Sequence, residues 1–147
     1  MENEMIELFK LRIEDCARER ESLRGLEWRF FFETLAAYAA IAYAYLKIQE
    51  KLVGSCHPVL LTLGIVATLI VSFSGWFLLR HAHIRMHVVA TLKYDYFKKM
   101  HEATGLPILE IGKTKPWYWA ILPQYLTLGS MATGLIGWMT WLASMGK

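Results

Sequence analysis

Residues 58–79 read PVLLTLGIVATLIVSFSGWFLL and contain no charged side chain. At a rise of about 1.5 Å per residue, a helix of this length crosses a hydrocarbon core of roughly 30 Å. The chain continues as RHAHIRMH over residues 80–87, and no glycine or proline follows until Gly105. The segment therefore predicts a membrane-spanning helix that continues into a basic, histidine-containing helix beyond the membrane.

The composition of the 147-residue chain fits a membrane protein. Hydrophobic residues make up 55% of it, which is high for a soluble domain, and most charged residues gather in residues 1–27 and 80–116. The net charge of +3 is too small to favour nucleic acid as a partner, because basic residues beside apolar spans are explained first by membrane topology. Cys16 and Cys56 lie on opposite sides of the first predicted span and show no metal-binding or redox spacing.

Two more segments have the length and apolar character expected of spans. Residues 28–46, WRFFFETLAAYAAIAYAYL, are at the short end of the range, and residues 117–145 open with aromatic residues suited to a membrane interface. The short connection over residues 47–57 predicts an antiparallel hairpin of the first two spans. We predict an all-α, polytopic membrane protein with three transmembrane helices and cytoplasmic helical extensions, assembled as an oligomer.

Four segments follow from the change in composition along the chain: a cytoplasmic amphipathic helix over 1–27, a transmembrane hairpin over 28–79, a cytoplasmic basic helix and loop over 80–116, and a third transmembrane helix over 117–147. Lysine and arginine concentrate in the first and third segments, so the positive-inside rule places both in the cytoplasm. Thr104-Gly105 predicts the end of the basic helix, residues 108–115 a loop or strand-like piece, and Pro123 a kink or a helix end.

The N-terminal segment has the spacing of a coiled-coil seam, because six residues alternate three and four apart: Ile6, Phe9, Ile13, Cys16, Arg20 and Leu23. Arg20 interrupts the otherwise apolar seam. The helix either rests on the cytoplasmic helix of its own chain or pairs with another copy, and the sequence leaves both readings open.

Small and polar residues recur at helical spacing within the predicted spans, where they allow helices to approach closely in lipid. We predict helix packing or pore lining at Ala36, Ala40, Gly64, Thr68, Ser72, Gln124, Ser130 and Gly134. Packing is the favoured reading, and a water path lined by hydroxyl groups is the alternative. Arg29 and Glu33 are four residues apart, so we expect them to pair near the interface in preference to ion or proton handling by Glu33.

Histidines form the densest group of candidate ligands: His81, His83 and His87, with His101 farther along. His83 and His87 share a helix face that would suit a metal or a haem edge, but contacts with the interface or with lipid headgroups are the favoured reading. We predict no metal and no cofactor. The residues expected to act in gating or interaction are Arg80, His83, Arg85 and His87.

Enzymatic activity has little support in the sequence. The spacing of Arg80 and His87 fits the Arg-x(4–6)-His pattern of HEPN ribonucleases, but so short a pattern arises readily by chance in a basic segment. No phosphate-binding loop, nucleophile elbow, HExxH or CxxC motif is present in the sequence. We therefore predict that the protein is not an enzyme.

The layout of the chain resembles that of small membrane effectors of bacterial antiviral systems. A charged N-terminal helix ending in LEWRFFF at residues 26–32, a two-span hairpin, a basic cytoplasmic helix and a late aromatic span are similar to the SLATT-type effectors and to the membrane accessory protein of some RNA-targeting CRISPR loci. The third span departs from the two-span SLATT pattern. The resemblance implies oligomerisation into a pore or membrane-disrupting assembly triggered from the cytoplasm, and it assigns no functional residue.

The expected function is that of a homo-oligomeric inner-membrane effector or pore-like protein, gated from its cytoplasmic helices, with its own copies and membrane lipid as partners. The alternative is a non-conducting membrane anchor or assembly subunit whose cytoplasmic helices dock a soluble partner. A metal- or haem-dependent membrane enzyme is the third and least favoured reading.

Overall fold

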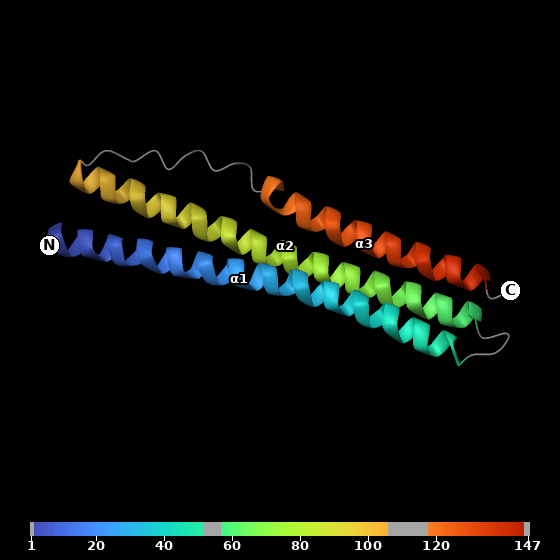
Figure 1. Ribbon diagram of the computed structural model, residues 1–147. Helices are drawn as coiled ribbons and strands as arrows, with labels where there is room; N and C mark the ends of the chain where they lie inside the picture. Colours follow the sequence, from blue (N-terminus) through green and yellow to red (C-terminus); the bar gives the residue numbers. More distant parts are fainter. Residues whose placement is uncertain (1, 52–56, 106–117, 146–147) are drawn as a thin grey trace. The chain divides into compact units, whose positions relative to one another are not determined.

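The computed structural model describes residues 2–51, 57–105 and 118–145, and those residues form three helices (Figure 1). Helix α1 runs Glu2–Gln49, α2 runs His57–Thr104 and α3 runs Tyr118–Met145. No strand occurs within these described ranges, so the predicted all-α class is confirmed. The predicted N-terminal helix and first span both lie on α1. The apolar run and the basic helix that follows it likewise both lie on α2.

The ends of the helices follow local chemistry. Gly105 has a φ of 66°, and its N–H donates to the carbonyl of His101 at 2.8 Å, so a left-handed glycine caps α2 where the stop was predicted. A kink or a helix end was predicted at Pro123. Pro123 lies inside α3, so the helix does not end there. The loop predicted over residues 108–115 lies outside the described residues.

The chain divides into two compact units. Unit 1 combines Met1–Trp28 with Arg80–Ala120, and unit 2 combines Arg29–Leu79 with Ile121–Lys147. On α1 and α2 the division falls at Trp28/Arg29 and Leu79/Arg80, where the sequence changes from charged to apolar.

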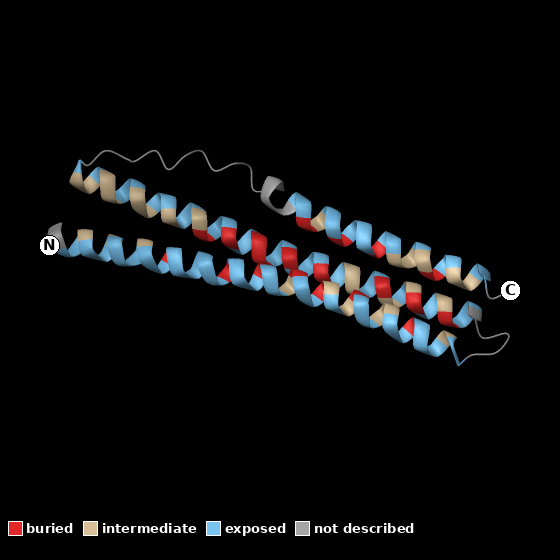
Figure 2. Cartoon of the chain, in the orientation of Figure 1, coloured by how far each residue is buried: buried red, intermediate tan, exposed pale blue. Residues whose placement is uncertain are grey.

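Unit 1 is held by an apolar seam between α1 and α2. Cys16 and Leu23 of α1 are buried together with Met86 and Val89 of α2, and Tyr96 packs against them. The buried residues recur along one side of each helix (Figure 2). Cys16 and Leu23 of the predicted seam are therefore buried against a helix of the same chain, whereas Ile6, Phe9 and Ile13 are only partly buried and Arg20 is exposed.

Unit 2 contains α3 from Ile121 onward and the apolar parts of α1 and α2. Two clusters form its core: Phe31, Tyr38, Leu79, Leu128 and Ala132 in one, and Tyr45, Leu60 and Met139 in the other. Thr34 lies against Gly75 while Tyr45, later on α1, lies against Gly64, earlier on α2. This reversed order makes the two helices antiparallel, as the short connection predicted.

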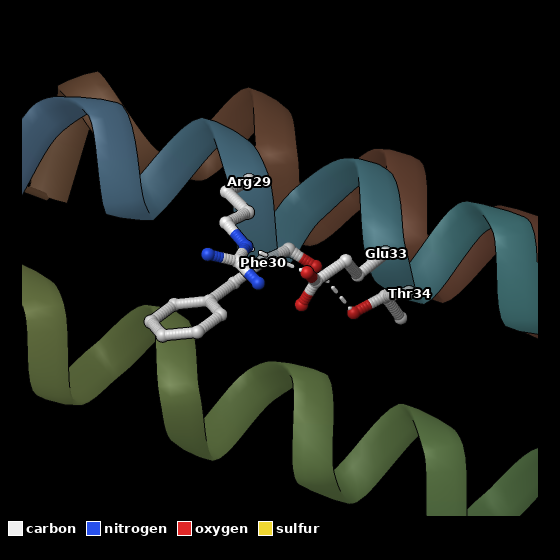
Figure 3. Close-up of polar contacts among 4 residues, drawn as sticks. All are labelled: Arg29, Phe30, Glu33 and Thr34. Atoms are coloured by element: carbon white, nitrogen blue, oxygen red, sulfur yellow. Dashed lines mark hydrogen bonds and ion pairs between the residues drawn. The ribbon is translucent and has the colours of Figure 1, made fainter.

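Glycines permit the close approach of these helices. A Cβ atom at Gly75 would lie 2.5 Å from Oγ1 and 2.7 Å from Cγ2 of Thr34, and one at Gly64 would lie 2.7 Å from Sδ of Met139. Thr34 cannot easily move away, because its hydroxyl donates to the carbonyl of Phe30 at 2.7 Å and fixes its rotamer (Figure 3). Helix α2 therefore packs against α1 and α3 at positions where it has no side chain of its own.

Among the described helices, only α2, over Pro58–Thr104, is long and apolar enough by length and composition to cross a membrane. The apolar part of α1 carries Arg29 and Glu33, and glycine, serine and threonine lower the apolar character of α3. The structure thus offers one candidate span where the sequence predicts three, and spans in α1 and α3 remain predictions.

Substitution Gly75→Ala should destabilise unit 2. Replacing glycine by alanine inside a helix gains about 0.5–1 kcal/mol, but overpacking a tight contact costs about 1–3 kcal/mol. The added methyl group would meet a side chain that is already held in place, so the cost should dominate and lower the melting temperature measured by circular dichroism. Gly134→Ala is the matched control, because a Cβ there meets nothing within 4 Å. A Gly75→Ala protein as stable as the control would contradict the packing described.

Candidate functional site

Hydroxyl groups link α1 to α2 within unit 2. The phenol oxygen of Tyr38 lies 2.8 Å from Oγ of Ser72, whose hydroxyl donates to the carbonyl of Thr68 at 2.6 Å. A serine hydroxyl has one proton, so Tyr38 must be the donor to Ser72. Thr68 is fully buried and donates in turn to the carbonyl of Gly64 at 2.8 Å. The predicted packing residues of α2 thus form one side of this contact, and their hydroxyl protons are used within the chain.

A second set of polar contacts joins α1 to α3. The buried hydroxyl of Tyr45 donates to the carbonyl of Met139 at 3.2 Å, and Nε2 of Gln49 reaches the carbonyl of Leu142 at 3.5 Å. The contact of Gln49 is at the distance limit of a hydrogen bond, so the bond of Tyr45 is the stronger polar interaction between α1 and α3. The carbonyl of Met139 also accepts within α3, so Tyr45 adds a contact there without removing a bond of the helix, whereas Leu142 lies in the last turn, where carbonyls lack an intrahelical donor.

Gln124 is the predicted packing residue whose surroundings stand out. It is buried on α3 one turn before Leu128, and its Oε1 atom has no hydrogen-bond partner among the described residues. A buried amide oxygen that is left unpaired costs free energy, because it has lost its bond to water. Helix α3 therefore carries one polar group that its own unit does not satisfy.

A shallow cavity of about 210 Å³ lies among the three helices of unit 2, lined by Tyr38, Ser72, Trp76, Tyr125, Leu128 and Gly129. Its walls are mainly apolar, and the hydroxyls of Tyr38 and Ser72 already bond to each other. The cavity therefore offers a ligand little polar recognition.

The other predicted packing residues point away from the core. Ala36 and Ala40 are exposed on α1, and Ser130 and Gly134 are exposed on α3. Ser130 donates its hydroxyl to the carbonyl of Thr127 at 2.9 Å, so it needs no further acceptor. Any helix contact at these four positions would be with another molecule.

Arg29 and Glu33 form the expected ion pair at the start of the apolar part of α1 (Figure 3). Nε of Arg29 donates to Oε1 of Glu33 at 2.7 Å, and the side chains are 69% and 55% exposed, respectively. The adjacent Thr34 is buried. A charged pair therefore lies on the outer side of a helix whose inner side is apolar.

The residues predicted to act in gating do not share one surface of unit 1. Arg80, Arg85 and His87 are exposed, whereas His83 is buried at 6% exposure. Glu27 of α1, which was not among the predicted residues, is also buried in this unit. The spacing contained a signal for it, because residue 27 is the next position after Leu23 in the three-four seam.

His83 has a perturbed acid–base equilibrium. Burial lowers its pKa from the ordinary value of 6.5, and the neighbouring charge of His87 lowers it further. The neutral imidazole is therefore favoured over a wider pH range in the folded protein than in the unfolded chain. Within the described ranges, no group of three or more histidine, cysteine, aspartate or glutamate side chains is placed to hold a metal ion.

Comparison of the chain with protein-family models, with characterised proteins and with solved structures finds no match. The function must therefore be inferred from the surfaces and polar contacts of the chain itself. Three of them matter most: the weakly buried apolar face of α2, the exposed pair of Arg29 and Glu33, and the buried His83.

Acidification should destabilise unit 1 through His83. Because its pKa is lowered on folding, the unfolded chain binds a proton at a pH where the folded chain does not, so stability falls as the pH drops below about 6.5. We expect the loss in melting temperature between pH 8 and pH 5.5 to be smaller in His83→Gln than in the wild type. His87→Gln should reduce it in part, because only the second cause of the shift is removed. Equal losses in all three proteins would contradict the prediction.

Proposed function

We propose that the protein is an integral protein of the cell inner membrane that assembles from several copies of its own chain and acts as a pore-like effector. The observation that carries the proposal is the exposure of α2. Only 17% of its most apolar stretch is buried. A core helix of a soluble protein would be mostly buried, and a signal sequence would lie near the N-terminus, so neither alternative fits this helix.

The uncovered surface extends beyond α2. Large apolar side chains are also exposed on the parts of α1 and α3 that belong to unit 2, among them Phe32, Leu46, Leu126 and Met131. Exposed apolar surface costs about 25 cal/mol per Å² in water, and lipid or further copies of the chain would remove that cost. This supports membrane spans in α1 and α3 as well, with the basic N-terminal segment and residues 80–116 in the cytoplasm.

A pore-like role is favoured over a purely structural one by the polar outer side of α1. The ion pair of Arg29 and Glu33 is more than half exposed, although it belongs to an apolar segment. Charged side chains in membrane segments usually face a bundle interior or a water-filled cavity. The link to antiviral defence rests on the layout of the chain alone.

The alternative role, a membrane anchor that docks a soluble partner, has one observation in its favour. Ile84, Val88 and Leu92 lie four residues apart on α2, beyond the uncharged run, and all three are exposed. Such a stripe could receive an amphipathic helix of another protein. Co-purification of a stoichiometric partner with a protein that is itself monomeric would favour this role.

The proposal predicts three properties of the protein expressed in bacteria. It should remain in the membrane fraction after washing with alkaline carbonate, its detergent-solubilised complex should have the mass of several chains, and its activation should depolarise cells loaded with a membrane-potential dye. Extraction by carbonate would contradict membrane insertion. A monomer in detergent that never depolarises cells would contradict the pore-like role and leave the anchor.

A further inference from the structure

The outward sides of the helices in unit 2 differ in chemistry. The outward side of α2 consists of large apolar residues at exposed positions: Val59, Leu63, Val66, Ile70, Phe73 and Phe77. They recur three and four residues apart, and no charged side chain interrupts them. Lipid chains would cover such a surface without leaving any polar group unsatisfied.

The outward face of α1 is different. It consists of Arg29, Glu33, Ala36, Ala40, Tyr43 and Lys47, all exposed and alternating four and three residues apart. With 3.6 residues per turn, these positions lie on the side of α1 opposite the buried Phe31, Tyr38 and Tyr45. This face has no large aliphatic residue. Its middle carries the small side chains of Ala36 and Ala40, and both of its ends carry charged side chains.

An ion pair lies at each end of the outward face of α1. Arg29 pairs with Glu33 at 2.7 Å, and Lys47 pairs with Glu50 at 2.9 Å, all with side chains at least half exposed. Lys47 and Glu50 lie in the predicted connection beyond the span, whereas Arg29 and Glu33 lie within the span, where hydrocarbon chains cannot solvate them and a charge costs several kcal/mol. Water or complementary charges on another copy would stabilise the face, whereas lipid would not.

The outward side of α3 carries exposed apolar residues such as Leu126 and Met131 together with hydroxyl groups that bond within the helix. Thr127, Thr133 and Thr140 donate to carbonyls of their own helix at 2.7–2.9 Å, as Ser130 does. A hydroxyl that bonds in this way is tolerated in a dry environment, so α3 does not need water as the charges of α1 do. Of the three outward sides, α1 has the strongest requirement for a polar environment.

From this contrast we infer that the outward face of α1 lines a water-filled path enclosed by several copies of this chain. The inference rests on the proposed function and adds which helix faces the path. Arg29 of one copy would lie near Glu33 of the next, so the opposite charges give a ring of alternating sign at one end. Ala36 and Ala40 leave room in the middle for ions and small polar solutes.

The accessibility of single cysteines to water tests the placement of α1. In a full-length chain with Cys16 and Cys56 replaced by serine, Ala40→Cys is compared with Ile70→Cys in membrane vesicles treated with a charged, membrane-impermeant thiol reagent. The two positions are a matched pair. Tyr38 contacts Ser72 across antiparallel helices, so residues 40 and 70 lie at the same depth, and both are exposed.

We expect Ala40→Cys to react at least about tenfold faster than Ile70→Cys, because a thiol in hydrocarbon forms little of the reactive thiolate. Equal rates, faster reaction at Ile70→Cys, or no reaction at either position would overturn the inference. So would reaction at Ser130→Cys but not at Ala40→Cys, which would place the path along α3. Because each variant is first shown to be inserted and of unchanged mass in detergent, such a result would refute the placement of α1 without refuting the proposed function.

Arg29 and Glu33 at the end of the path give a second test, in which removing one charge or the other should change the ion selectivity in opposite directions. In liposomes containing the purified assembly and a potassium chloride gradient, Glu33→Gln leaves Arg29 unpaired and should lower the cation-to-anion permeability ratio. Arg29→Gln leaves Glu33 unpaired and should raise that ratio. We expect changes of at least about twofold that shrink at 1 M salt, where the screening length falls to about 3 Å. Changes of the same sign in both variants, or no change in either, would overturn the inference.

Discussion

The contact between α1 and α2 in unit 2 determines where its other residues lie. Gly75 removes the side chain that would collide with Thr34, and the hydroxyl of Tyr38 then reaches Ser72 at 2.8 Å. A polar group in an apolar seam must find a partner, since its desolvation is otherwise uncompensated. Ser72 can accept from Tyr38 because its own proton goes to Thr68. Rotating either helix by one residue would lose the glycine contact and the hydrogen bond together, so the pairing has one favoured register.

That register also places α3. With Tyr38 opposite Ser72, Tyr45 lies opposite Gly64, where the lack of a side chain admits both the phenol ring and Met139 of α3. The hydroxyl of Tyr45 then bonds to the carbonyl of Met139. A tyrosine supplies apolar area along its ring and a donor at its tip, so it can cross a dry seam and still satisfy its hydroxyl. Two tyrosines seven residues apart, two turns along one face of α1, thus connect it to both of its neighbours.

The sequence predicted the helices more fully than it predicted their faces. The helical spacing of apolar residues and the length of the uncharged run predicted the all-α class and the extension of α2 beyond residue 79. Gly105 predicted its end at Thr104. Small-residue spacing marked Gly64 and Thr68 of α2, which lie in the core, and also Ala36 and Ala40 of α1, which are exposed. Small residues at intervals of four occur on either side of a helix, and only the position of the bulky Phe31 and Tyr38 decides which side is buried. The burial of Glu27 and His83 depends on the partner helix, which a single sequence does not reveal.

The two seams of α1 and α2 are built from different chemistry. The seam of unit 2 is apolar, and its hydroxyls are satisfied by neighbouring oxygens, so it is compatible with a dry environment on every side. The seam of unit 1 buries Cys16 and Leu23 but also the ionisable Glu27 and His83. Burying an ionisable group is costly in hydrocarbon, where neither water nor counter-ions are near, and far less so in a helix pair bathed by water. Under the proposed membrane insertion, the buried polar groups of unit 1 would be met by water and the uncovered apolar side of α2 in unit 2 by lipid. The charged pair of Arg29 and Glu33 falls where the sequence passes from one kind of seam to the other.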